Sequence, residues 1–269
     1  MQDIEAICFE TTGPFGSFRV PATTRGFITF PVIPRTAAVG LIAAILGVER
    51  NEAYEEEHFL YRAKIAIQCL NDPKIIGFRT NLIQTKNVLK IKKATFYFPR
   101  NLKRGYRSPQ TDVYLKEPKF RIFVQFEDSK KMAELSNRLK EKEYHYIPYY
   151  GRANLFCHPE YIGEVRLQEC TSEKKTLCTI PEAVILDEIY QGSFTYVFSV
   201  PMNYKKSSDG LSLSRIANIL HFKVDPTQES EKSGALVIKS EELACHTIKE
   251  GPDPMKWYIG KEVAFLPST

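Results

Sequence analysis

An uninterrupted run of apolar residues and glycine extends from Ala37 to Val48 and sets the first condition on the fold. A helix over residues 37–46 carries apolar side chains in every direction, so it must be buried on all sides, and a sheet is the element best able to cover it. Thr36 is expected to cap its first turn and Gly47 to end it. The run has 12 residues, too few for a membrane-spanning helix, which needs ~20. The sequence therefore predicts a helix packed on a sheet in a globular protein.

Segments with strand character lie on both sides of this helix. Their apolar patterns predict strands at residues 4–10, 64–70, 120–126 and 144–150. Asp128 is expected to cap a second amphipathic helix that ends near Lys142, and residues 51–62 are expected to form a more polar helix. The order of the main elements, with the segment between the second and third strands set aside, is the βαββαβ order of ferredoxin-like domains.

These patterns predict an α+β fold with two parts. Residues 1–155 are expected to form the ferredoxin-like (RRM-like) domain, with a basic thumb hairpin inserted at about residues 72–118. Residues 156–269 are expected to form a β-rich C-terminal extension, because short apolar segments alternate there with polar loops. Its strands are predicted at residues 164–169, 183–189, 194–201, 235–238 and 257–264.

The expected insertion is strongly basic. Between Lys74 and Arg121 the sequence has 13 basic and two acidic residues, a net charge of +11 in a chain whose overall net charge is +5. Cations that contact phosphates, next to rings on which bases stack, are typical of proteins that bind single-stranded or structured RNA. A solvated surface and an acidic protein partner are the alternatives. The interleaved aromatic residues are Phe78, Phe96, Tyr97, Phe98, Tyr106 and Tyr114.

A second candidate for phosphate contact is the loop at residues 13–19, which contains two glycines and a proline. Backbone amides can approach a phosphate closely where glycine leaves room, and Arg19 and Arg25 lie near the loop in sequence. The amides that follow Thr36 at a helix N-terminus form another candidate anion site. The alternative for Gly13 and Gly16 is that they are simply turn residues.

Cysteine usage and the N-terminus favour an intracellular protein. The six cysteines form no C-x-x-C pair, so we expect reduced, mostly buried thiols and neither a disulfide framework nor a zinc ribbon. The first residues are acidic and resemble no leader peptide, so a cytoplasmic location is expected. No cofactor, metal or membrane contact is expected. The signatures G-x-x-x-x-G-K-[ST], H-E-x-x-H and G-x-S-x-G are absent.

The first 155 or so residues also resemble a known family. The motifs Gly13-x-Phe15-Gly16-x-Phe18-Arg19 and Phe30-Pro31-x-x-Pro34-Arg35-Thr36-Ala37, continued through Gly47, are similar to the signature of the fifth family of CRISPR-associated proteins. These are RAMP-superfamily subunits of type I Cascade surveillance complexes. Arg107-x-Pro109-Gln110-Thr111 and Tyr149-Tyr150-Gly151 resemble the type I-B branch.

This resemblance implies an antiviral-defence subunit that caps the five-prime handle of the CRISPR RNA. It also implies contacts with the large and backbone subunits of Cascade and, through the complex, an indirect relation to target DNA. Taken with the basic arm and the two candidate anion sites, it gives the residues that we expect to contact RNA. They are Gly13, Phe15, Gly16, Phe18, Arg19, Arg25, Arg35, Thr36, Lys86, Lys92, Lys93, Arg100, Lys103, Arg104, Tyr106 and Arg107.

The alternative function is a metal-independent endoribonuclease that processes CRISPR repeat RNA, as the type I-C branch of the same family does with a tyrosine, a lysine and a histidine. Such cleavage needs a base near the attacking 2′-hydroxyl and a cation or acid near the leaving oxygen. The candidates are His145, between Tyr144 and Tyr146, and His58, which follows Glu55–Glu57. Neither is adjacent to a lysine, and the carboxylates beside His58 would repel RNA. The sequence therefore favours a non-catalytic RNA-binding subunit over an enzyme.

Overall fold

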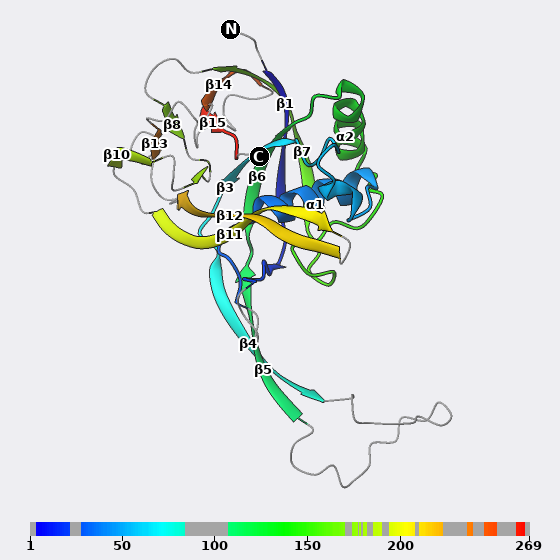
Figure 1. Ribbon diagram of the computed structural model, residues 1–269, viewed down its shortest axis with the longest axis vertical. Coiled ribbons are helices and arrows are strands. Elements are labelled where there is room, and N and C mark those ends of the chain that lie inside the picture. Colours follow the sequence, from blue (N-terminus) through cyan, green and yellow to red (C-terminus); the bar gives the residue numbers. More distant parts are fainter. Residues whose placement is uncertain are drawn as a thin grey trace.

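The structure is a computed structural model that describes residues 4–21, 28–83, 107–169, 174–176, 178, 180–181, 185–189, 194–207, 210–222, 236–238, 245–251 and 262–266 (Figure 1). The fold is mixed α/β and is dominated by antiparallel sheet, as the predicted class requires. Helices α1 (Arg35–Leu46) and α2 (Ser129–Glu141) pack in one hydrophobic core with the central sheet.

The central sheet has six strands, and each neighbouring pair is antiparallel. Alternate side chains face two separate cores, one shared with the helices and one shared with C-terminal residues such as Phe265. In the order β15-β14-β7-β1-β6-β3, the strands are β15 (Glu262–Ala264), β14 (Cys245–Glu250), β7 (His158–Glu169), β1 (Ile4–Thr12), β6 (Lys119–Gln125) and β3 (Lys64–Cys69). The sheet therefore contains strands from both sides of residue 155.

Helix α1 is buried on nearly every side, as its composition predicts. Ten of its twelve residues are buried, and Gly47 ends it in the left-handed conformation with φ 78°. The predicted cap is wrong, however: the helix begins at Arg35, Pro34 occupies the N-cap, and no side chain caps the first turn. Thr36 lies inside the helix, where its hydroxyl is 3.5 Å from the carbonyl oxygen of Pro201. The partner of Thr36 is thus a strand far along the chain, which local sequence does not reveal.

Helix α2 follows the prediction closely. The side chain of Asp128 accepts hydrogen bonds from the amides of Lys130 and Lys131, and Leu135 and Leu139 form the buried stripe. An amphipathic helix with an acidic N-cap can be recognised locally, because its cap and its apolar face are both set by nearby residues.

The strand predicted at residues 144–150 is wrong. The amides of His145 and Tyr146 donate to the carbonyl oxygens of Ile45 and Ala44, so this segment covers the end of α1 instead of joining a sheet. The fourth strand of the predicted order is replaced by β7, which pairs with β1. The last carbonyl groups of a helix need hydrogen-bond donors from outside the helix. A segment that supplies these donors can have the same sequence pattern as a β-strand.

The polar helix predicted at residues 51–62 is also wrong. Only a single 3-10 turn, η1 (Glu52–Tyr54), forms there, followed by turns. Tyr54 is buried and its hydroxyl donates to the carbonyl oxygen of Thr36 at 2.8 Å, while Glu55 and Glu56 form ion pairs with Lys206 and Lys205. These tertiary contacts replace the regular helix.

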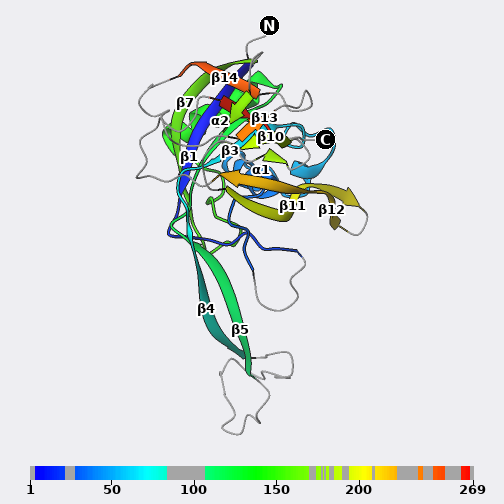
Figure 2. The ribbon, with the colours of Figure 1, turned by 90° about the vertical axis from the view of Figure 1, so that its left-hand side faces the viewer.

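The structure has two long antiparallel ribbons. In the first, β4 (Lys74–Ile83) pairs with β5 (Arg107–Lys116), and Figures 1 and 2 show it projecting far from the central sheet. The second lies across α1 and consists of β11 (Phe194–Ser207) and β12 (Gly210–Phe222). A short third strand, β9 (Ile180–Pro181), pairs with β12. A small sheet contains β10 (Ile185–Ile189), β13 (Leu236–Ile238) and β8 (Lys174–Thr176).

Several predicted strands of the C-terminal part overlap these elements, whereas the sequence patterns do not predict β12 and β14. Cys8, Cys69, Cys157 and Cys178 are buried free thiols, and burial raises the pKa of Cys157 to about 12. Within the described ranges, no group of three or more histidines, cysteines or acids is placed to hold a metal ion. No helix in the described part of the chain is long and apolar enough to cross a membrane.

The glycine at position 151 can be tested by unfolding. A Cβ there would lie 2.1 Å from the carbonyl oxygen of Ser17, at a φ of 78°. We expect Gly151→Ala to lower the free energy of unfolding by about 2–5 kcal/mol, from the left-handed backbone and the displaced loop. Gly40→Ala is the matched control, because a Cβ there meets nothing within 4 Å, and it should raise stability by up to ~1 kcal/mol. Equal urea midpoints for the two variants would contradict this assignment.

Candidate nucleic-acid interface

The base of the projecting ribbon is built by the loop at residues 13–19. Its short strand β2 (Phe15–Gly16) pairs with β5, opposite Lys116 and Leu115, and the amide of Glu117 donates to the carbonyl oxygen of Pro14 at 2.9 Å. The loop is therefore the third strand of the ribbon. This position explains why a motif near the N-terminus accompanies a basic insertion about sixty residues later in sequence.

A partly exposed group of three rings lies at this base, and we call it the outer ring cluster: Phe15, Phe78 and Tyr114. The ring centroids are 5.5–6.4 Å apart in edge-to-face arrangements. The cross-strand register places Phe78 and Tyr114 on one face of the ribbon. Phe78 is 47% exposed, so the cluster offers aromatic surface to a ligand.

The only acidic side chain within β4 and β5 is neutralised at the same place. Asp112 is 8% exposed; it accepts from Arg152 Nη1 at 3.2 Å and from the side-chain amide of Gln110 at 2.6 Å. The Arg152 guanidinium also lies over the Tyr114 ring, 5.2 Å from its centroid, and donates to the Tyr114 hydroxyl at 2.9 Å. Among the side chains of the two strands that the structure describes, the exposed cations are Lys74, Arg79 and Lys116. The described ribbon surface is therefore positive.

Behind the loop lies a buried group of three rings, the inner ring cluster: Phe18, Phe120 and Tyr150. Their centroids are 5.7–6.0 Å apart. Tyr150 is fully buried, and its hydroxyl donates to that of Thr11 at 2.5 Å. This cluster connects the ribbon base to β1 and β6 of the central sheet.

The loop glycines pack against the inner cluster. A Cβ at Gly13 would lie 2.9 Å from the carbonyl oxygen of Phe156 and 3.1 Å from the Tyr150 ring, and one at Gly16 would lie 3.3 Å from Pro118. Two amides of the loop and the amide that directly follows it are already hydrogen-bonded within the protein. The amides of Ser17, Phe18 and Val20 donate to the Tyr150 carbonyl, the Thr29 hydroxyl and the Ile28 carbonyl. Phe15 and Arg19 remain the loop side chains that can reach a ligand, since Arg19 is exposed.

Arg35 lies in the core, and Thr36, which is 6% exposed, lines a cavity next to the loop. Arg35 is 1% exposed and donates to the carbonyl oxygens of Tyr61, Ala63 and Met202 at 2.9, 2.8 and 3.3 Å. Burial lowers the pKa of Arg35 to about 10, so it stays charged at neutral pH. These contacts hold α1 to β11 and to the turn before β3. They leave no exposed surface of Arg35 for RNA.

Next to the loop, a cavity of about 670 Å³ opens over the one exposed side of α1. Its floor contains Gly40, and Arg19 and Arg50 contribute its cationic side chains. Because Arg19 follows Phe15 by four residues, a single short segment leads from the outer ring cluster to the cavity. The tyrosines in its lining are Tyr54, Tyr146, Tyr149 and Tyr204.

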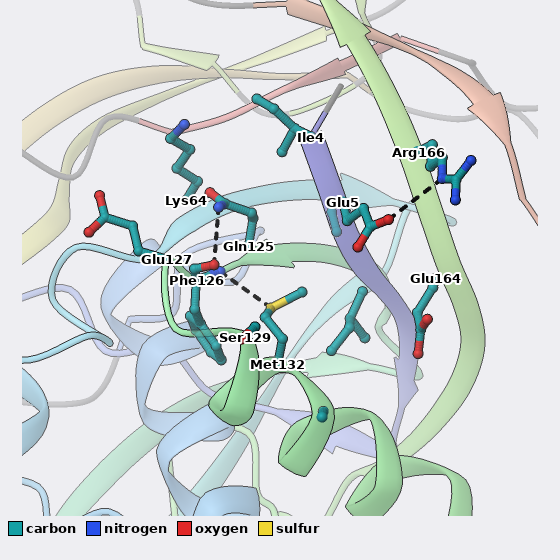
Figure 3. A pocket seen from close by; sticks show the side chains of 13 residues that line it. Ile4, Glu5, Lys64, Gln125, Phe126, Glu127, Ser129, Met132, Glu164 and Arg166 are labelled. Carbon is teal, nitrogen blue, oxygen red and sulfur yellow. Dashed lines mark hydrogen bonds and ion pairs between the residues drawn. The ribbon is translucent and has the colours of Figure 1, made fainter. Parts of the chain in front are cut away.

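A second cavity, of about 860 Å³, lies between the start of β1 and the first turn of α2 (Figure 3). Three carboxylates line it, those of Glu5, Glu127 and Glu164, against two cations. One of these, Arg166, is paired with Glu5 at 3.6 Å. An acidic lining repels phosphate, so this cavity does not fit a nucleic acid.

The two candidate catalytic histidines lie apart from the ribbon face. His145 is exposed and packs edge-on against Tyr146, whose hydroxyl donates to Glu49 at 3.0 Å. His58 packs on Phe59, and its Nδ1 accepts from the amide of Leu60 at 3.2 Å. Burial lowers the pKa of His58, which favours the neutral imidazole.

The structure brings Gly13, Phe15, Gly16, Phe18 and Arg19 together at the ribbon base and places Arg35 in the core and Thr36 in the lining of the 670 Å³ cavity. Arg107 belongs to β5, and its side chain is outside the described set. The other predicted contacts lie outside the described residues: Arg25, Lys86, Lys92, Lys93, Arg100, Lys103, Arg104 and Tyr106.

Sequence reasoning does not find Arg152 or Gly40. Arg152 directly follows the Tyr149-Tyr150-Gly151 motif, but its partner is 40 residues away, and no local pattern indicates the pair. Gly40 carries a signal that could have found it, namely a glycine within a helix otherwise composed of good core residues.

Comparisons with known proteins give a family and a similar fold. Residues 6–219 match the family model described as CRISPR-associated protein (Cas_Cas5). A crystal structure of a CRISPR protein from Archaeoglobus fulgidus is similar over 97% of this chain and 99% of that chain, with 12% identity and a TM-score of 0.54. A chain described as a CRISPR RNA-guided surveillance complex is similar over 87% of this chain and 90% of that chain, with 13% identity and a TM-score of 0.49. No curated protein matches the chain.

The Arg152–Asp112 pair can be tested by its contribution to stability. Arg152→Met removes the cation that Asp112 faces, and we expect the free energy of unfolding to fall by about 1–2 kcal/mol, with weaker amide-exchange protection in residues 107–116. Lys205→Met is the control, since its pair with Glu56 is exposed on both sides and is worth ~0.2–1 kcal/mol. Equal decreases, with β5 protection unchanged, would show that the pair does not hold the ribbon base.

Proposed function

Because this chain belongs to the CRISPR-associated Cas5 protein family, we propose that it is a non-catalytic CRISPR RNA-binding subunit of a type I, I-B-like Cascade complex. In this proposal it caps the five-prime handle of the CRISPR RNA. The observation that carries the proposal is the positive ribbon with a partly exposed ring cluster at its base. We also assign the strand order β7-β1-β6-β3 and the two helices to the ferredoxin-like plan.

Electrostatics support RNA as the ligand of the ribbon. The segment from Lys74 to Arg121 carries a net charge of +11, and the only acid within β4 and β5 is bound to Arg152. Pairing Asp112 removes a repulsive charge from the face that would meet phosphate. Phosphate neutralisation by such a segment supplies most of the sequence-independent affinity for a nucleic acid.

The outer ring cluster supports a single-stranded ligand. Phe78 is exposed, and Phe15 and Tyr114 hold it in an edge-to-face arrangement. Stacking of a base on such a ring is worth roughly 1–3 kcal/mol and requires a base that is free of a duplex. A handle at the end of a guide RNA meets this requirement. The large subunit, the backbone subunit and, indirectly, target DNA are the further partners in this proposal.

The proposal is tested by salt-dependent RNA binding. Arg19→Ala combined with Lys103→Ala and Arg104→Ala should weaken binding of a repeat-derived handle RNA. The slope of log K against log salt should become shallower by about 2, because each phosphate that the protein no longer neutralises reduces it by ~0.7. The control removes three exposed cations of the body: Lys130→Ala, Lys140→Ala and Arg166→Ala.

In the same samples, a bound handle should be protected from added ribonuclease. If the two triple variants bind alike, or the handle is digested at the rate of free RNA, the ribbon does not hold RNA. Protection also separates RNA binding from docking of an acidic protein on the ribbon.

The endoribonuclease alternative predicts a different result. Purified protein with EDTA would cut a repeat RNA at one position, and His145→Ala would abolish the cut. We expect intact RNA after incubation with folded protein, because His58 is engaged with Leu60 and His145 lies beside a tyrosine that is bound to Glu49. A single EDTA-resistant cut that His145→Ala removes would replace the proposal.

A further inference from the structure

Gly40 is unusual because it has no structural task that requires glycine. It lies within α1, it is exposed, and a Cβ built on it meets nothing within 4 Å. Glycine at an interior helix position costs ~0.5–1 kcal/mol relative to alanine. Gly47 and Gly151, by contrast, adopt a positive φ, and Gly13 packs too closely against Phe156 and Tyr150 to carry a side chain. The absence of a side chain at Gly40 instead keeps the floor of the 670 Å³ cavity low.

The walls of this cavity are tyrosine rings held in place by contacts of their own. The Tyr54 hydroxyl donates to the carbonyl oxygen of Thr36 at 2.8 Å, and the Tyr54 ring packs edge-on against Tyr204 at 5.3 Å. On the other side, the Tyr146 hydroxyl donates to Glu49 at 3.0 Å. Tyr149 also lines the cavity and is 43% exposed. Rings fixed in this way lose little freedom when a flat ligand enters between them.

Charge indicates which kind of flat ligand fits. Arg19 and Arg50 line the cavity together with one carboxylate, that of Glu49, which is already bound to Tyr146. Two cations next to aromatic walls suit a nucleotide, whose base is flat and whose phosphate is anionic. An apolar side chain of a partner protein would gain nothing from the arginines. The volume lies within the ~300–1,000 Å³ of ligand cavities.

We propose that this cavity binds one unstacked nucleobase of the bound RNA. The base lies between Tyr146 and Tyr149 on one side of the cavity and Tyr54 on the other. The phosphate of that nucleotide lies at Arg19 and Arg50. This inference rests on the proposed function, since it assigns a base-binding site next to the ribbon that grips the strand. Residues 15–19 join the outer ring cluster to the cavity, so a strand that follows them would place successive nucleotides at the two sites.

The experiment combines an abasic scan of the RNA with filling of the cavity. Handle RNAs with a single abasic nucleotide at each position in turn are bound to the parent protein, to Gly40→Leu and to Gly40→Ala. Leucine at position 40 fills the cavity without a clash at its Cβ and favours the helix, so the variant should fold; circular dichroism and urea unfolding check this. Tyr149→Ser and Tyr149→Phe form a second pair, which removes or keeps one ring.

In the parent, one abasic position should weaken binding by roughly 5- to 150-fold. Gly40→Ala adds only a methyl group to the floor, so its sensitivity should lie between that of the parent and that of Gly40→Leu. In Gly40→Leu and Tyr149→Ser the intact RNA should bind more weakly by a similar factor, and the abasic change at that position should have no further effect. Tyr149→Phe should behave as the parent.

If the parent binds RNA but no position is sensitive, or if Gly40→Leu keeps the sensitivity of the parent, the cavity holds no base and only this inference fails. If the parent binds no RNA, the proposed function fails and the inference fails with it.

Discussion

The ribbon, the central sheet and the cavity are all joined by one contact, between the loop at residues 13–19 and the segment that ends at Gly151. The amide of Ser17 donates to the carbonyl oxygen of Tyr150 at 3.1 Å, and the carbonyl oxygen of Ser17 lies where a side chain at position 151 would have to go. Phe15 and Gly16 of the same loop pair with β5, and Phe18 packs on Phe120 of β6. The direction of the ribbon is therefore set at its base by close backbone approach, which glycine at positions 13 and 151 permits.

The distribution of charge favours binding of a polyanion at the ribbon. The segment from Lys74 to Arg121 has a net charge of +11 and the whole chain has +5, so the remaining residues together have a net charge of 5 − 11 = −6. The acidic residues include the three carboxylates of the cavity in Figure 3, which lies beside the start of α2. A polyanion approaching this molecule is attracted to the ribbon and repelled by the acidic surface. Asp112 is the one acidic residue of strands β4 and β5, and its ion pair with Arg152 neutralises its charge.

Much of the fold could be predicted from local sequence, and the errors share one cause. Helix α2 and strands β1, β3 and β6 follow from caps and apolar periodicity, because each is decided within a few residues. The predictions for residues 144–150 and 51–62 are wrong, since their conformations depend on the end of α1 and on β11, which are distant in sequence. The same limit applies to the site. The aromatic and basic character of the ribbon is visible in composition, whereas burial of Arg35 among three carbonyl groups and the salt bridge of Arg152 require the tertiary structure.

The central claim is that the ribbon face with the outer ring cluster binds the end of a guide RNA. Its most direct test is ultraviolet cross-linking of the protein loaded with its RNA, followed by mass spectrometry of the cross-linked peptides. The account predicts nucleotide adducts on peptides within residues 74–83 and 107–116, with Phe78 or Tyr114 as the modified residue. Adducts confined to α2 and β7, with the ribbon peptides unmodified, would contradict it.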